Sequence, residues 1–218
     1  MKKKKEISAI ASSVPSILPL ARAAYDRSLL SYSEASVCIV LSVMAIEGFF
    51  NELVCWSDGG NKYLTEKEKM LGIVLEEAEK SKLSLMAKLQ QINFVLTGKV
   101  FDKSSLFYFD FKLLIEIRNA IVHRKPEPIP DRNIDNPIIP HKLVQKVLDR
   151  KIIETDKEPL MRAIWSYYII NPWVARWSYN NALNVIMFIL DKLPDGHVKA
   201  RVERNYKNIR KIKNLPKD

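Results

Sequence analysis

Apolar residues recur along most of the chain at intervals of three and four, which is the spacing of a helix with one buried face. The first strong run predicts a helix over 33–56, followed by a turn at the Asp-Gly-Gly-Asn sequence of 58–61. Thr65 lies three residues before Glu68, so the next run predicts a helix that begins with a capping box and ends near Lys80. The dominant period is therefore helical.

The same periodicity continues to the end of the chain. It predicts helices at 83–96, 106–123, 142–150, 159–169 and 172–193. Gly98 ends the first of these, Ser104 or Ser105 caps the second, and proline at the first position opens the last. Five prolines within 126–140 exclude a helix there and predict an ordered loop. Beyond residue 197 a basic tail again has apolar residues at helical spacing up to Ile212.

These segments predict an all-α fold, an antiparallel bundle of long helices. We expect a basic N-terminal tail at 1–15, a helical domain at 16–197 that includes the proline-rich loop, and a basic C-terminal helix or tail at 198–218. Six glycines in 218 residues also disfavour sandwich and dinucleotide-binding folds, which use glycine at turns and phosphate loops.

The charge is concentrated at the two ends of the chain. The net charge is +10, of which 1–6 carries +3 and 199–218 carries +6, so the remaining residues carry only +1. Basic ends on a neutral body favour contact with a polyanion, either nucleic acid or an anionic membrane surface. Tails that only improve solubility are the alternative.

Several features favour a cytoplasmic protein without stable membrane insertion. The segment 7–21 after the first lysines contains serines and prolines that are poor for a secretory signal. No charge-free apolar stretch reaches the roughly 18 residues of a spanning helix. Cys38 and Cys55 lie within one predicted helix, about 25 Å apart at 1.5 Å per residue, so we expect two reduced core thiols.

The common signatures of cofactor and metal chemistry are absent from the sequence. It contains no P-loop, GxGxxG, HExxH or GxSxG motif. The three histidines, His123, His141 and His197, are far apart along the chain, so we expect neither a zinc site nor a cofactor. The last two lie beside loop residues and are expected to be solvent-exposed.

The segment 118–126 combines residues suited to RNA cleavage. Arg118 presents five donors and is permanently charged, which suits phosphate, and a histidine such as His123 can act as general acid or base. Asn119 is four residues before the histidine, on the same helical face, where its amide could orient the imidazole. Arg124 and Lys125 could contact RNA phosphates. Such a set needs no metal.

This run resembles the Arg-polar-x-x-x-His signature of the HEPN superfamily (higher eukaryote and prokaryote nucleotide-binding domains). The segment 43–53, in which small and apolar residues precede Glu47 and an aromatic pair, is similar to an early helix of many HEPN proteins. The resemblance extends over about 23–123 and, more loosely, the last strong helix. The proline-rich insertion and the helices after it depart from simple family members.

The resemblance implies a HEPN-like bundle and a metal-independent endoribonuclease, in which two copies bring their motifs together in a homodimer. Arg118 and His123 would then be catalytic, Asn119 would assist, and Glu47 would be a supporting polar residue. RNA would be the substrate. A toxin–antitoxin or antiviral-defence role, with an antitoxin or defence-system partner, is also implied.

The candidate site residues could instead have structural roles. In that case the protein would be a non-catalytic HEPN-like dimeric adaptor or nucleic-acid-binding protein. Arg118 could form a salt bridge with Glu116 or Glu47, and His123 could cap a helix C-terminus. An aromatic cluster favours core or dimer packing over base stacking. Its members are Trp165, Tyr167, Tyr168, Trp173, Trp177 and Tyr179.

Overall fold

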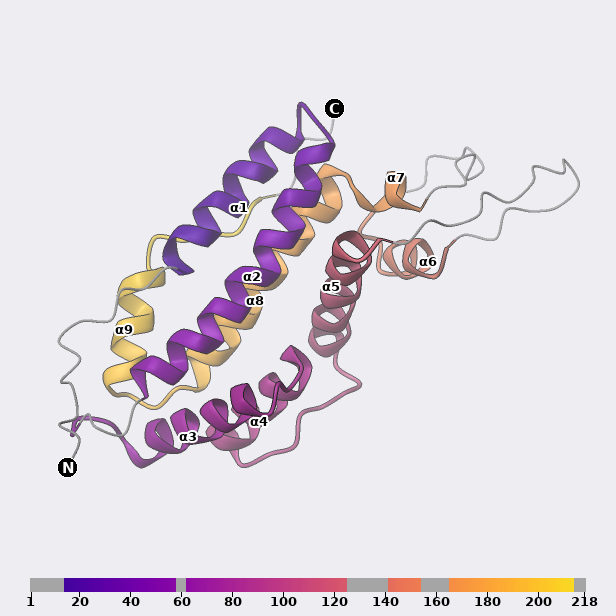
Figure 1. Ribbon diagram of the computed structural model, residues 1–218. Helices are drawn as coiled ribbons and strands as arrows, with labels where there is room; N and C mark the ends of the chain where they lie inside the picture. Colours follow the sequence, from indigo (N-terminus) through magenta and orange to yellow (C-terminus); the bar gives the residue numbers. More distant parts are fainter. Residues whose placement is uncertain (1–13, 58–61, 125–140, 154–164, 214–218) are drawn as a thin grey trace, which may run out of the picture.

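The computed structural model describes residues 14–57, 62–124, 141–153 and 165–213, and in these ranges all regular secondary structure is helical (Figure 1). The helices are α1 Val14–Ser28, α2 Ser33–Trp56, α3 Glu66–Lys80, α4 Leu85–Thr97, α5 Leu106–Val122, α6 Lys142–Asp149, α7 Ser166–Ile169, α8 Pro172–Lys192 and α9 His197–Tyr206. The prediction of an all-α fold is confirmed. The predicted turn at 58–61, the proline-rich loop at 126–140 and the first part of the helix predicted at 159–169 lie outside the described residues.

The helix ends follow local hydrogen bonding that the sequence had indicated. The Thr65 hydroxyl accepts from the backbone N–H of Glu68 at 3.2 Å, while the Glu68 carboxylate accepts from the backbone N–H of Thr65 at 2.8 Å, which completes the predicted capping box. Gly98 ends α4 with a positive φ of 71°, a conformation that glycine adopts without steric cost. Asn171 caps α8 by accepting from the N–H of Val174 at 3.0 Å.

The central helix of the bundle is α2, which packs against α1, α3, α5, α8 and α9. Its aromatic pair Phe49 and Phe50 is fully buried. In Figure 1, α1 and α5 run antiparallel to α2, as expected, but α8 runs parallel to it. The Cys38 thiol donates to the carbonyl of Ala175, so the first turns of α2 and α8 lie side by side. A long connection through α6 and α7, rather than a short hairpin loop, precedes α8 and permits this orientation.

Two segments, α1 and residues 197–213, contribute more to the bundle than the sequence indicated. The helix α1 was not predicted, because Pro19 and several serines obscure its pattern. The segment expected as a basic C-terminal helix or tail is helical only to Tyr206, and Val202 and Tyr206 are buried. Ile212 is also buried, in a non-helical stretch whose backbone exchanges two hydrogen bonds with the Asn180 side chain at 2.8 and 2.9 Å.

The two cysteines differ in their surroundings. Cys38 is buried, and desolvation raises the pKa of its thiol to about 12. Cys55 is exposed, which corrects the prediction that both are core thiols. The reason is their spacing, since 17 residues along a helix turn the second thiol away from the face of the first.

Among the described residues, α2 is the one helix long and apolar enough, by length and composition, to cross a membrane. In the bundle, 56% of its most apolar window is buried. Glu47 on this helix forms an ion pair with Arg118, and the Glu52 carboxylate accepts from the Tyr206 hydroxyl at 3.3 Å. Burial and paired carboxylates are what a central bundle helix requires.

Candidate functional site

The predicted catalytic motif lies at the C-terminal end of α5. Ser105 begins this helix by accepting from the N–H of Tyr108 at 3.3 Å, and the apolar face carrying Phe111 and Ile117 is buried against the bundle. The last helical residue is Val122, and His123 is the C-cap, with its backbone N–H donating to the carbonyl of Asn119 at 2.9 Å. The imidazole is therefore exposed at the end of an anchored helix.

Arg118 points from α5 toward α2. Its guanidinium forms an ion pair with Glu47 and donates to the side-chain carbonyl of Asn119 at 3.0 Å. The Arg118 side chain is 20% exposed and that of Glu47 is 40% exposed, so the pair lies at the edge of the interface between the two helices. Of the two structural partners considered for Arg118, Glu47 is the one observed; Glu116 pairs with Lys146 instead.

These contacts link three of the predicted site residues. The two hydrogen bonds from Arg118 occupy two of the five N–H donors of a guanidinium and fix its direction. The carboxylate of Glu47 offsets part of the positive charge of Arg118, so the arginine is positioned but partly neutralised. Glu47 thus supports Arg118 directly.

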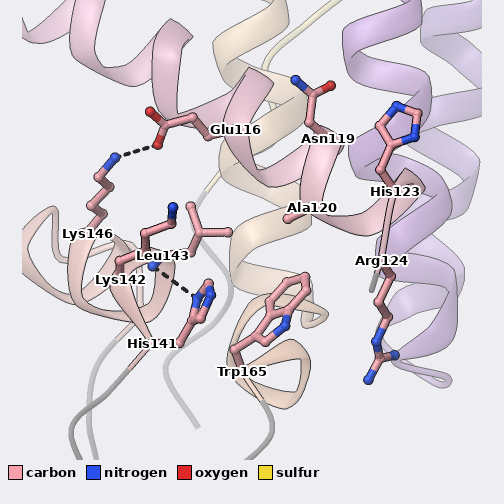
Figure 2. A pocket seen from close by; sticks show the side chains of 10 residues that line it. All are labelled: Glu116, Asn119, Ala120, His123, Arg124, His141, Lys142, Leu143, Lys146 and Trp165. Carbon is pink, nitrogen blue, oxygen red and sulfur yellow. Dashed lines mark hydrogen bonds and ion pairs between the residues drawn. The ribbon is translucent and has the colours of Figure 1, made fainter. Parts of the chain in front are cut away.

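A pocket of about 410 Å³ opens beside the end of α5, and its far wall comes from α6 and Trp165 (Figure 2). The residues around it are Glu116, Asn119, Ala120, His123, Arg124, His141, Lys142, Leu143, Lys146 and Trp165. Three predicted site residues therefore share one pocket: Asn119, His123 and Arg124. Arg118 and Glu47 do not line it, and Lys125 lies outside the described residues.

His141 lines the pocket, and the sequence-based prediction that it is solvent-exposed is wrong. It is half-buried rather than solvent-exposed, because its ring stacks on Trp165 with centroids 5.4 Å apart and planes at 24°. Its Nδ1 accepts from the backbone N–H of Leu143 at 3.3 Å, so the imidazole caps α6. The available signal was its position directly before a helical pattern, where a capping side chain is expected. His197 is likewise half-buried, beside the start of α9.

The charged side chains around the pocket are mainly basic. Lys146 and Glu116 pair with each other across the pocket, whereas Arg124 and Lys142 are exposed and form no ion pair with any other part of the chain that the structure describes. Two positive charges thus remain at the rim. This arrangement suits an anion.

The predicted aromatic cluster is dispersed between core and surface. Trp165 and Tyr179 are buried, while Tyr167 and Trp173 are 56% and 44% exposed. Within the ranges that the structure covers, no group of three or more His, Cys, Asp or Glu side chains could hold a metal ion.

No protein-family model matches the chain, and neither a curated protein nor a solved structure is significantly similar to it. The candidate site is therefore inferred from the residues of this chain and their geometry alone.

Proposed function

We propose that this protein is a metal-independent endoribonuclease of HEPN type that acts as a homodimer. The observation that carries the proposal is the placement of His123 at the exposed end of α5, on a pocket with a basic rim, one helical turn from Asn119. Arg118, held by Glu47, lies on the same final turns of the helix. A titratable imidazole and a permanent cation on one rigid helix end match the requirements of phosphodiester cleavage.

The proposed reaction is attack by a ribose 2′-oxygen on the neighbouring phosphorus. The new bond joins phosphorus to the 2′-oxygen, and the bond from phosphorus to the 5′-oxygen of the next nucleotide breaks. His123 of one copy accepts the 2′ proton, and the imidazolium of the second copy gives a proton to the departing 5′-oxygen. Arg118 stabilises the charge that accumulates on the phosphorane-like transition state. The products are a 2′,3′-cyclic phosphate and a 5′-hydroxyl.

The chemistry of the cut ends tests this reaction. Wild-type protein incubated with RNA in the presence of a chelator should produce 5′-hydroxyl ends, because neither proton transfer requires a metal. Cleavage that stops on chelation, or that leaves 5′-phosphate ends, would contradict the proposed reaction.

The Arg118–Glu47 ion pair also supports a second candidate function, a non-catalytic dimeric adaptor or nucleic-acid-binding protein. In that case the pair only joins α5 to α2, and the exposed basic side chains Arg204, Lys207 and Arg210 bind the nucleic acid. Deleting 199–218 does not test this cleanly, because it removes buried Val202. If the protein is such an adaptor, replacing these three basic residues by glutamine should abolish RNA binding and leave the fold intact. Neither the wild-type protein nor this variant would then cut RNA.

A toxin–antitoxin or antiviral-defence role, with its protein partner, belongs to the same proposal through the HEPN resemblance. Cytoplasmic localisation remains a prediction from the sequence.

A further inference from the structure

The pocket beside His123 has a wall that the motif does not supply. The motif contributes Asn119, His123 and Arg124 from the end of α5, while α6 and the residues on either side of it contribute the opposite wall (Figure 2). The volume of about 410 Å³ falls within the range of roughly 300–1,000 Å³ typical of small-molecule sites. The space is therefore large enough for a ligand rather than only for water.

The charged side chains around this pocket favour an anionic ligand. Arg124 follows the end of α5 and Lys142 lies in the first turn of α6, so two cations with no ion-pair partner in the described ranges lie on opposite sides of the pocket (Figure 2). The pair of Lys146 with Glu116 adds no net charge. Among the described residues that line the pocket, the excess is therefore two positive charges. Arg and Lys side chains are both frequent ligands of phosphate groups.

The inner wall of the pocket is apolar, planar and held in place. Trp165 is only 5% exposed and stacks on His141, whose ring is fixed in turn by its capping hydrogen bond to the N–H of Leu143. Leu143 is also buried. A rigid aromatic and aliphatic wall opposite a cationic rim suits a ligand with a planar group and a negative charge.

We propose that this pocket binds a nucleoside phosphate, with Arg124 and Lys142 on phosphate groups at its two sides and the base or ribose against the wall of Trp165, His141 and Leu143. The inference rests on the proposed function, because it assigns to RNA a nucleotide subsite next to His123. The same chemistry could come from an RNA strand or from a free nucleotide. Lys142, His141 and Trp165 are thereby added to the site from outside the motif.

Binding without cleavage tests the proposal. A 2′-O-methyl oligoribonucleotide lacks a free 2′-hydroxyl and stays intact, so its affinity can be measured by fluorescence anisotropy on wild-type, Arg124→Ala and Lys142→Ala proteins. Each variant should bind about tenfold more weakly, as expected for removing one charge-assisted hydrogen bond. The slope of log K against log salt should become shallower by about 0.7 for each phosphate that the variant no longer neutralises.

Lys103→Ala is the matched control, since Lys103 is exposed at the opposite end of α5. It should change the affinity less than about twofold, and all three substitutions should leave the Tm unchanged because the side chains are exposed. Titration with adenosine 5′-monophosphate separates the two sources. A pocket-dependent affinity for the oligonucleotide assigns the site to an RNA strand, whereas one for the mononucleotide alone assigns it to a free nucleotide.

The proposal is overturned if neither ligand distinguishes the pocket variants from Lys103→Ala. That result would leave the ribonuclease activity untouched, because cleavage is measured separately on ordinary RNA. Conversely, pocket-dependent binding by a protein that never cuts RNA would retain the subsite and remove the proposed nuclease.

Discussion

At the scale of single residues, the site depends on how Arg118 is held. The sequence predicted the arginine and two carboxylates as its structural partners, and the structure selects Glu47. It could not predict that the Arg118 side chain turns toward α2, whereas His123 is among the residues that line the pocket. Five residues along a helix amount to about 140° around its axis, so the final direction depends on the side-chain contacts of each residue.

Glu47→Gln separates the two candidate functions at this scale. Because both side chains are partly exposed and screened by solvent, removing the ion pair should lower the free energy of unfolding by no more than about 1 kcal/mol. In the ribonuclease, Arg118 would lose its orientation and the cleavage rate should fall, by about tenfold. Urea unfolding and RNA cleavage measured on one preparation would check both effects.

Asn51 offers the control, since it is exposed one turn further along α2. Asn51→Ala should change neither quantity. A Glu47→Gln protein with reduced stability and an unchanged cleavage rate would restrict Glu47 to a structural role.

At the scale of helices, local sequence signals predicted where most helices begin and end, but they did not predict how the helices pack against one another. Caps such as Thr65, Ser105 and Asn171 act within a few residues, so their effects can be inferred from the sequence. The parallel contact of α2 with α8 joins segments more than 100 residues apart, and no local pattern encodes it. For the same reason the sequence missed the pocket, whose walls belong to separate helices.

Glu68 provides a prediction at this scale, because one buried carboxylate joins α3 to α9. It accepts from the N–H of Thr65 at 2.8 Å and from the N–H of Val198 at 2.7 Å, and it is fully buried. Glu68→Ala would leave the buried N–H of Val198 and the partly buried N–H of Thr65 unpaired, and should lower the free energy of unfolding by about 2–4 kcal/mol. Urea denaturation measures this loss.

An exposed glutamate on the same helix is the matched control. Glu77→Ala should cost less than about 0.5 kcal/mol. Equal stability losses for Glu68→Ala and Glu77→Ala would show that the buried carboxylate does not join the two helices.

At the scale of the whole molecule, buried titratable groups limit stability at alkaline pH. Burial raises the pKa of Cys38 to about 12 and raises the pKa of Tyr25, Tyr179 and Tyr206 above the ordinary tyrosine value. The pKa of Tyr206 is raised further by the Glu52 carboxylate, which accepts its hydrogen bond.

The sign of the pH effect follows from these directions. Above about pH 8 the unfolded chain begins to lose these protons, first from the thiol, before the folded protein does, so the folded state binds more protons and the free energy of unfolding falls as pH rises. This stabilisation is fully present below about pH 8. Urea midpoints at pH 7 and 8 should be equal and the midpoint at pH 10.5 should be lower, and a midpoint that stays constant to pH 11 would contradict the prediction.

The basic residues near the C-terminus belong to a segment that is partly buried in the bundle. The C-terminal segment belongs partly to the core, through Val202, Tyr206 and Ile212, while its basic side chains Arg204, Lys207 and Arg210 remain exposed. These three exposed side chains lie on the surface of the bundle and do not line the pocket where the chemistry is proposed, so any RNA binding by them would be separate from that pocket.

The proposed catalytic role of His123 is tested by the cleavage rate of His123→Ala on RNA in a chelator, relative to wild type and to a His197→Ala control. His123 is exposed, so the variant should keep the wild-type Tm. If His123 is catalytic, His123→Ala abolishes cleavage, while His197→Ala cuts at the wild-type rate. Cleavage by His123→Ala at the wild-type rate would contradict that role.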